Sequence, residues 1–154
     1  MEKILNIKLI EEKALKLFNS GYNCSQAVLT AYSDMLELNA ELALSVSCGF
    51  GAGMGKLQGT CGAVTGAYMV FSVYCGNKYK DNSDRKLNSY LMIQNFNNKF
   101  VEKYKSTDCK SLLNCDLKTD EGQKQFQIDN LIEKVCENCI KDSIILVKEQ
   151  IEKQ

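Results

Sequence analysis

The sequence predicts an all-α protein, a single-domain bundle of about six helices with a glycine-rich interhelical loop. Three observations lead to this prediction. The chain of 154 residues contains no proline, the residue that breaks helices most strongly. Apolar residues recur at spacings of three and four along most of the chain, whereas no sustained alternation typical of a strand occurs. We find no linker or repeat, so residues 1–154 are expected to form one domain.

Apolar stripes at helical spacing mark the expected helices. In chain order they are Ile7–Phe18, Val28–Met35, Leu42–Val46, Val64–Tyr74, Leu87–Tyr104 and Ile128–Ile151. Ser20-Gly21 is a typical helix end and closes the first helix, while Asn39 begins the third as its cap. The stretch GFGAGMG at 49–55 closes the third helix, and Cys75-Gly76 closes the fourth. A polar loop at 77–84 precedes the fifth.

Charge and hydropathy exclude several classes of protein. The 19 basic and 19 acidic residues cancel, so the chain lacks the concentrated positive charge that nucleic-acid binding requires. No segment approaches ~18 apolar residues without a charge, so no membrane span is expected. The N-terminal segment MEKILNIKLIEEKALKLF is charged throughout and has no small-residue cleavage site. We expect it to be a helix rather than a signal peptide, and the protein to be cytoplasmic.

Eight cysteines and no histidine restrict the chemistry further. Reducing compartments seldom keep structural disulfides, so these thiols are expected to be metal ligands, redox groups or buried core residues. Without histidine there is no histidine general base, no Cys–His dyad and no mixed Cys/His zinc site. A c-type haem site is excluded too, because Ile140 follows Cys136-Glu-Asn-Cys139 where that site needs histidine.

Three cysteines directly follow residues that typically cap helices. These pairs are Asn23-Cys24, Thr60-Cys61 and Asp108-Cys109, and Gln26 completes a capping-box variant with Asn23. Each cysteine is expected to be the first helical residue, where unpaired N–H groups and the helix dipole favour a negative sulfur. Such an environment lowers the pKa of a thiol, and the thiolate binds metals or attacks disulfides. Three thiols of this kind could converge on one anionic cluster.

The remaining cysteines have a simpler interpretation. Free cysteine packs well as a small hydrophobic residue, and this interpretation is favoured for Cys48, Cys75 and Cys139. Cys136 and Cys139 also form a C-x-x-C pair, which places both sulfurs on one helix face. Without a second pair this motif is a weak signal. Cys115 either pairs with Cys109 or lines the same pocket.

The glycines near Cys61 have two interpretations. A Gly-x-Gly-x-Gly stretch before a helix can cradle a phosphate, but neither a preceding strand nor a following Gly-Lys-Ser/Thr supports this. Gly62 and Gly66 share one helix face, which lets another helix or a cofactor approach closely. Helix packing is the favoured explanation for the spacing of Gly62 and Gly66. It is compatible with a cofactor, and we also expect Gly59, Gly62 and Gly66 to border a bound cofactor. Tyr22 is the aromatic residue expected near the site.

The order of the motifs resembles one known family. GYNCSQAV, GFGAGMG, TCGAVTGA, DCKSLL and VCENC follow one another between Lys13 and Cys139. This order resembles that of the redox-active proteins named for a C…GCAxxG…C…C pattern. The resemblance implies that the family's four cysteines are Cys24, Cys61, Cys109 and Cys136.

Two details depart from the family pattern. Cys61-Gly62 reverses the Gly-Cys order of the family label, and Glu137 stands where members often have proline after the last cysteine. If the final helix begins near Asn138, Cys136 also lies at a helix N-terminus and joins the other three thiols.

The resemblance implies a redox-active protein typical of anaerobic prokaryotes, related to a domain of split-Soret cytochromes where an iron–sulfur site accompanies haem. We therefore expect Cys24, Cys61, Cys109 and Cys136 to bind an iron–sulfur cluster, since four thiolates are its standard ligands. Electron transfer with a partner protein is the expected role, and enzymatic turnover and a homodimer stay open. Two alternatives are a metal-free protein cycling disulfides among these cysteines, and a helical module with a structural Cys₄ zinc site or no metal.

Overall fold

The structure is a computed structural model that describes residues 6–154, so the first five positions of the expected N-terminal helix lie outside the described residues. Its α-helices are α1 (Ile7–Asn19), α2 (Cys24–Ala31), α3 (Ala40–Ser47), α4 (Gly62–Lys78), α5 (Asn82–Tyr104), α6 (Cys109–Leu113), α7 (Asp120–Ile128) and α8 (Glu137–Glu152). Two irregular turns, η1 (Cys48–Phe50) and the π-helical η2 (Ile132–Cys136), join them. Within the described residues no strand forms, which confirms the predicted all-helical bundle.

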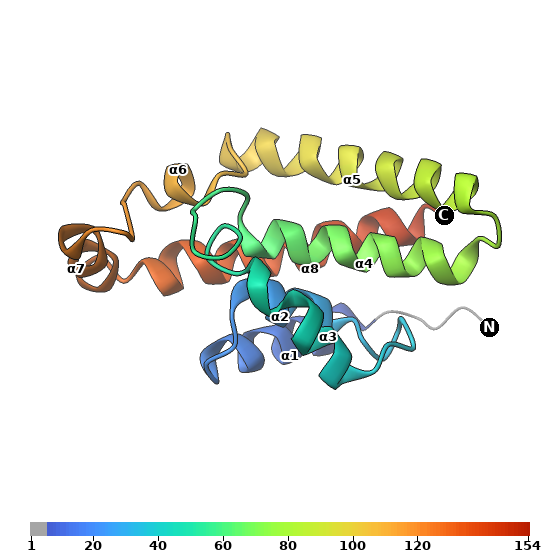
Figure 1. The fold of residues 1–154 in the computed structure, drawn as a ribbon, viewed down its shortest axis with the longest axis horizontal. Helices are drawn as coiled ribbons and strands as arrows, with labels where there is room; N and C mark the ends of the chain where they lie inside the picture. Colours follow the sequence, from blue (N-terminus) through green and yellow to red (C-terminus); the bar gives the residue numbers. More distant parts are fainter. Residues whose placement is uncertain (1–5) are drawn as a thin grey trace.

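The three long helices form the centre of the bundle. Figure 1 shows α4 and α8 side by side, with α5 on one side of the pair and α1, α2 and α3 on the other. The rings of Phe71, Phe96 and Phe100 fill the space between α4 and α5. Tyr32, which ends α2, donates its hydroxyl to the carbonyl of Ile144 in α8 at 2.6 Å. None of the described helices combines the length and apolar character needed to cross a bilayer.

Most helix boundaries follow the expected signals. Ser20 ends α1, and Gly21 next to it has a φ of +101°, which glycine adopts without strain. Asn39 caps α3 through its side chain, which accepts the N–H of Leu42 at 3.0 Å. The predicted end of the fourth helix at Cys75-Gly76 is wrong, because α4 continues to Lys78.

The predicted final helix is divided into three pieces. Ile128 ends the separate helix α7, and Asn130 in the following turn has a φ of +51°. The chain re-enters a helix through η2, whose π-helical turn continues directly into α8. The α-helix α8 begins at Glu137, next to the expected Asn138, but η2 continues directly into it, so Cys136 does not lie at a free helix N-terminus. With the short turn α6, which was expected at Cys109, and the separate helix α7, the described residues form slightly more helices than the expected six.

Helices α2 and α4 lie unusually close together. A Cβ atom at Gly66 would lie 2.9 Å from the Cβ of Val28 and 3.0 Å from the carbonyl oxygen of Ser25. A Cβ at Gly62 would lie 2.3 Å from the sulfur of Cys24. All three distances are too short for a real Cβ atom unless its neighbours move, so the glycines allow this contact, as their shared helix face predicts.

This packing can be tested with two alanine substitutions in the same helix. We expect Gly66→Ala to lower the free energy of unfolding by about 1–3 kcal/mol, because the added methyl group must displace α2. Gly76→Ala is the control, because a Cβ there meets nothing within 4 Å. It is expected to raise stability by up to about 1 kcal/mol, since alanine is the better helix former.

Urea unfolding followed by circular dichroism measures both effects. Equal stabilisation of the two variants would contradict the close contact between α2 and α4.

Candidate functional site

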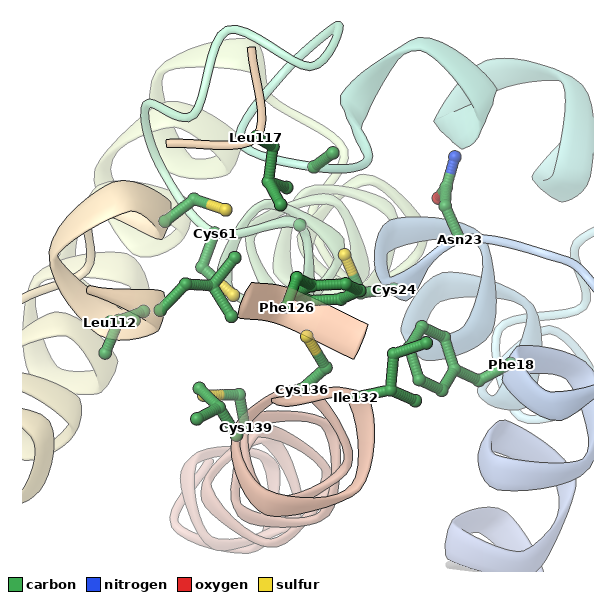
Figure 2. A pocket seen from close by; sticks show the side chains of 15 residues that line it. Phe18, Asn23, Cys24, Cys61, Leu112, Leu117, Phe126, Ile132, Cys136 and Cys139 are labelled. Carbon is green, nitrogen blue, oxygen red and sulfur yellow. The ribbon is translucent and has the colours of Figure 1, made fainter. Parts of the chain in front are cut away.

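A cavity of about 200 Å³ lies where the beginnings of α2, α4, α6 and α8 meet, at the end of the bundle that carries α6 and α7. Five of the eight cysteines line it: Cys24, Cys61, Cys109, Cys136 and Cys139. The other side chains on its wall are almost all apolar, among them Phe18, Leu112, Leu117 and Phe126. Figure 2 shows the labelled cysteines around this space. The structure thus brings together all four cysteines that the sequence singled out.

A capping box positions Cys24 at the start of α2. The side chain of Asn23 accepts the N–H of Gln26 at 2.9 Å, and the side chain of Gln26 accepts the N–H of Asn23 at 3.0 Å. The same two side chains also donate to backbone carbonyls, Asn23 to Cys48 and Gln26 to Leu44. Cys24 is therefore the first residue of α2, as predicted, and its cap is attached to α3 and η1.

Backbone pairing brings Cys61 beside Cys109. The N–H of Cys61 donates to the carbonyl of Thr107 at 2.7 Å, and the N–H of Cys109 donates to that of Gly59 at 2.6 Å. Thr60 and Asp108 form an antiparallel bridge between these two bonds. The predicted cap at Thr60 is wrong, because Cys61 itself is the N-cap of α4 and makes no side-chain cap bond.

Asp108 and Gln58 hold the segment that carries Cys109. Asp108 caps α6 by accepting the N–H of Ser111 at 2.9 Å, so Cys109 is the first residue of that helix, as predicted. The buried amide of Gln58 donates to the carbonyl of Cys115 at 3.0 Å and accepts the N–H of Leu117 at 2.8 Å. Sequence reasoning missed Gln58, since no local motif marks a side chain that bridges two distant loops.

Cys136 and Cys139 approach the cavity from α8 and the turn before it. Cys136 is the last residue of η2, and the C-x-x-C spacing places both sulfurs on the face that borders the cavity, as predicted. Cys139 is buried, with 1% of its surface exposed, as expected for a core residue. It also lines the cavity beside Cys61, a role that sequence reasoning missed although the C-x-x-C motif contained the signal.

The other cysteines lie outside the cavity. Cys75 is a core residue, as predicted, and its sulfur lies 3.7 Å from that of Met92. Cys48 is exposed at the end of α3, so its predicted burial is wrong. Cys115 is free and packs in a small apolar cluster beside the cavity, so it neither pairs with Cys109 nor lines the pocket.

Two further expectations concern residues around Cys61. The prediction that Tyr22 lies near the site is wrong, because its side chain is 39% exposed and does not line the cavity. The aromatic residues that line the cavity are Phe18 and Phe126. Of the three glycines, Gly62 lines the cavity. The carbonyl of Gly59 binds Cys109, and Gly66 packs against α2. That the three border a cofactor stays a prediction.

Burial dominates the protonation of most cavity thiols. It raises the pKa of Cys24 to about 11 and that of Cys109 to about 12, and the charge of Cys61 adds to both shifts. Burial is also the largest cause of the raised pKa of Cys136. The prediction that helix N-termini lower the pKa values of Cys24 and Cys109 is therefore wrong, because desolvation outweighs the helix ends.

Cys61 is the exception among these thiols. A hydrogen bond from the thiol of Cys139 is the largest cause of the lowered pKa of Cys61, and the N–H groups of Ala63 and Val64 act in the same direction. The same hydrogen bond raises the pKa of Cys139. The predicted lowering of the pKa by a helix N-terminus is thus present at α4, but it is smaller than the effect of Cys139.

The chemistry of the cavity follows from its donors. Among residues 6–154, no three cysteine, aspartate or glutamate side chains form a ready-made set of ligands around one point. The sulfurs instead surround an apolar space. Soft thiolates of this kind are suited to zinc, copper(I) or iron–sulfur groups, and thiols that share one cavity are suited to disulfide exchange.

A helical bundle with a cysteine-lined cavity at one end defines the class of this protein. Residues 22–150 match the family described as "Putative redox-active protein (C_GCAxxG_C_C)". The chain belongs to this family. No curated protein and no solved structure matches it.

The raised pKa values predict how the stability of the metal-free protein depends on pH. Thiols ionise near about pH 8.5 in an unfolded chain, whereas Cys24 and Cys109 ionise near about 11 and about 12 in the folded protein. Between these values the folded state binds more protons, so stability is complete below about pH 8.5 and falls above it. We expect a loss of up to about 1.4 kcal/mol per pH unit for each fully buried thiol. Cys61, with its lowered pKa, acts oppositely: its contribution is lost as pH falls.

Urea unfolding of the reduced, metal-free protein from neutral pH to about pH 10.5 measures this dependence. Cys109→Ser is expected to make the decline shallower, because one thiol that must stay protonated is gone. Cys48→Ser, at an exposed position, is the control and should match the unmodified chain. An unchanged decline in Cys109→Ser would contradict the account of the cavity thiols.

Proposed function

We propose that the cavity holds an iron–sulfur cluster bound by Cys24, Cys61, Cys109 and Cys136, and that the protein transfers electrons to a partner protein. The observation that carries this proposal is the convergence of these four cysteines, which are far apart in the sequence, on one cavity. When bound, such a cluster supplies reversible one-electron chemistry.

The donor set and the shape of the cavity fit this group. Apart from Asn23, the side chains on the wall are cysteine or apolar, so thiolates are the ligands on offer. A single zinc ion requires four ligands at about 2.0–2.3 Å from one point. The sulfurs of this chain surround a cavity of about 200 Å³ instead, which favours a group with several metal atoms over one ion.

The chain's own groups would stabilise thiolates once a cation compensates for their burial. The backbone N–H groups of Ala52 and Ser25 act to lower the pKa of Cys24, and those of Ala63 and Val64 act to lower the pKa of Cys61. Hydrogen bonds to cluster sulfurs raise a reduction potential, as does positive charge from helix ends. These donors are fixed by the fold, so they need no rearrangement when the thiols release their protons.

Apolar side chains from the segment between α5 and α8 cover the site. Leu112 and Leu113 come from α6, while Leu117 and Phe126 come from the segment that follows. Their role in the proposal is to exclude water from the thiolates, since the hydrophobic shell controls solvent access and redox potential. Cys24 and Cys136 are partly exposed, so we place the exchange of electrons with the partner protein near these two ligands.

We also propose a cytoplasmic location. All eight cysteines are free in the structure. Free thiols in this number suit a reducing compartment, where glutathione and thioredoxin keep cysteine reduced.

The cluster can be tested by metal analysis of protein purified without oxygen. We expect a brown protein that contains iron and acid-labile sulfide. Single serine variants of the four proposed ligands should each lose most of both, because a neutral hydroxyl replaces a soft thiolate. The controls are Cys75→Ser in the core and Cys48→Ser on the surface, which should keep them.

Either of two results would contradict this function. One is a Cys24→Ser or Cys61→Ser variant with undiminished iron and sulfide. The other is a colourless parent protein that contains zinc, or no metal, after strictly anaerobic purification.

A further inference from the structure

We propose that residues 118–130, which contain α7, form a flap that closes the cavity with the ring of Phe126. Opening of this flap gives a metal group access to the thiols, and this second part rests on the proposed function. Three of the cavity cysteines are shielded from solvent: Cys61 is 8% exposed, Cys109 7% and Cys139 1%. A group with several metal atoms reaches these sulfurs only when part of the cavity wall moves.

Most of the cavity wall is fixed to the rest of the bundle. Helices α1, α2, α4 and α8 all contribute to the main apolar core. Helix α6 is held at both ends, because the N–H of Cys109 donates to the carbonyl of Gly59 at 2.6 Å. Beyond α6, the buried side chain of Gln58 bonds to the backbone of Cys115 and Leu117. These parts cannot move away from the cavity without breaking the core or these bonds.

Helix α7 depends on Phe126 for its attachment to the cavity wall. Among residues 6–154, no hydrogen bond or ion pair joins the flap to a residue before Asp116 or after Lys134. The residues of α7 that are not exposed are Gly122 and Phe126, and Gly122 packs against the nearby carbonyl of Asp116. Figure 1 shows α7 at one extreme of the molecule, beyond the long helices. Lifting the flap therefore breaks no hydrogen bond to any long helix.

The ring of Phe126 is placed to close the cavity. It lines the cavity together with Cys24 and Cys136, the two partly exposed cysteines, and Figure 2 shows the ring between their side chains. It packs against the small apolar cluster that contains Cys109 and Leu117. Contacts between apolar groups are not directional, so they can be broken and formed again without a precise geometry.

Both ends of the flap allow a change of direction. Asn130 has a φ of +51°, in the left-handed region that asparagine adopts more readily than most residues. The π-helical η2 follows it, and such wide turns often occur at functional sites. At the other end, Lys118 and Thr119 are exposed and bond to Asp116 within their own turn. The flap can thus swing outward while α6 and α8 stay in place.

Thiol labelling of the metal-free, reduced full chain tests this opening. The reagent is fluorescein maleimide, which is too large for a closed cavity of about 200 Å³. Cleavage after lysine releases Cys109 in the peptide 106–110 and the core residue Cys75 in the peptide 57–78, where tandem fragmentation separates it from Cys61. We expect Cys109 to react at least about tenfold faster than Cys75 and with a weaker dependence on urea, because a local opening exposes less surface than global unfolding. Equal rates with equal urea dependence would overturn the proposal.

Three alanine variants supply the matched comparison. Phe126→Ala should raise the labelling rate of Cys109 by about tenfold, because loss of the apolar contact makes opening more frequent. Ile128→Ala is the control in the same helix and should leave that rate unchanged, since Ile128 is 81% exposed. Val70→Ala weakens the main core, so it should speed the labelling of Cys75 but not that of Cys109.

Two results with these variants would overturn the flap. One is an unchanged rate for Cys109 in Phe126→Ala. The other is a rise for Cys109 in Val70→Ala that matches the rise for Cys75, because both thiols would then react through global unfolding. The comparison of Cys109 with Cys75 in the unmodified chain decides the question even if a variant fails to fold.

Loading from a glutathione-bound iron–sulfur cluster separates this inference from the proposed function. Phe126→Ala should take up the same final amount as the unmodified chain, since Phe126 is not a ligand, but about tenfold faster, in step with its labelling. Equal loading rates would overturn access through the flap. If neither protein takes up a cluster, the proposed function fails, and the labelling still decides whether the flap opens.

Discussion

Helices α2 and α4 can meet closely because Gly62 and Gly66 carry no side chain where they touch. The sulfur of Cys24 occupies the space that a Cβ at Gly62 would need. This contact brings the N-terminus of α2 beside that of α4, and with them two of the cavity cysteines. The pairing of Cys61 with Thr107 then adds the third cysteine, and α8 packs alongside α4 to add the others. The site is therefore a consequence of how the bundle closes at one end.

Two opposing electrostatic effects meet in this cavity. Helix N-termini and backbone N–H groups favour negative sulfur, but burial in apolar surroundings penalises it. Burial prevails for Cys24 and Cys109, while Cys61 has a lowered pKa because it also receives a hydrogen bond from Cys139. A cation at the site would reverse the balance, because it removes the penalty and leaves the fixed donors in place. Under the proposed function, Cys24 and Cys109 would be protonated in the empty cavity and would become thiolates when a metal group is bound.

The sequence predicts the helix caps of this fold well, but it predicts the contacts between distant segments less well. The capping box at Asn23 and the cap at Asp108 are set by neighbouring residues, so they position Cys24 and Cys109 as predicted. Thr60 fails as a cap because the bridge to Asp108 engages its backbone instead. Cys139 fits an apolar stripe and also faces a cavity, a distinction that only packing makes. The glycine-rich loop after η1 was predicted to end the third helix. The left-handed φ values of Ala52, Met54 and Lys56 in this loop have no sequence signal, since such residues rarely adopt them.

The central claim is that thiolates from four separated segments share one metal group. X-ray absorption at the iron edge, recorded on protein isolated without oxygen, tests it most directly. The account predicts iron surrounded by sulfur alone in its first shell, with further iron as the next neighbour, because the cavity wall offers thiols and carbon. Oxygen or nitrogen ligands in the first shell, or isolated iron atoms without an iron neighbour, would contradict it.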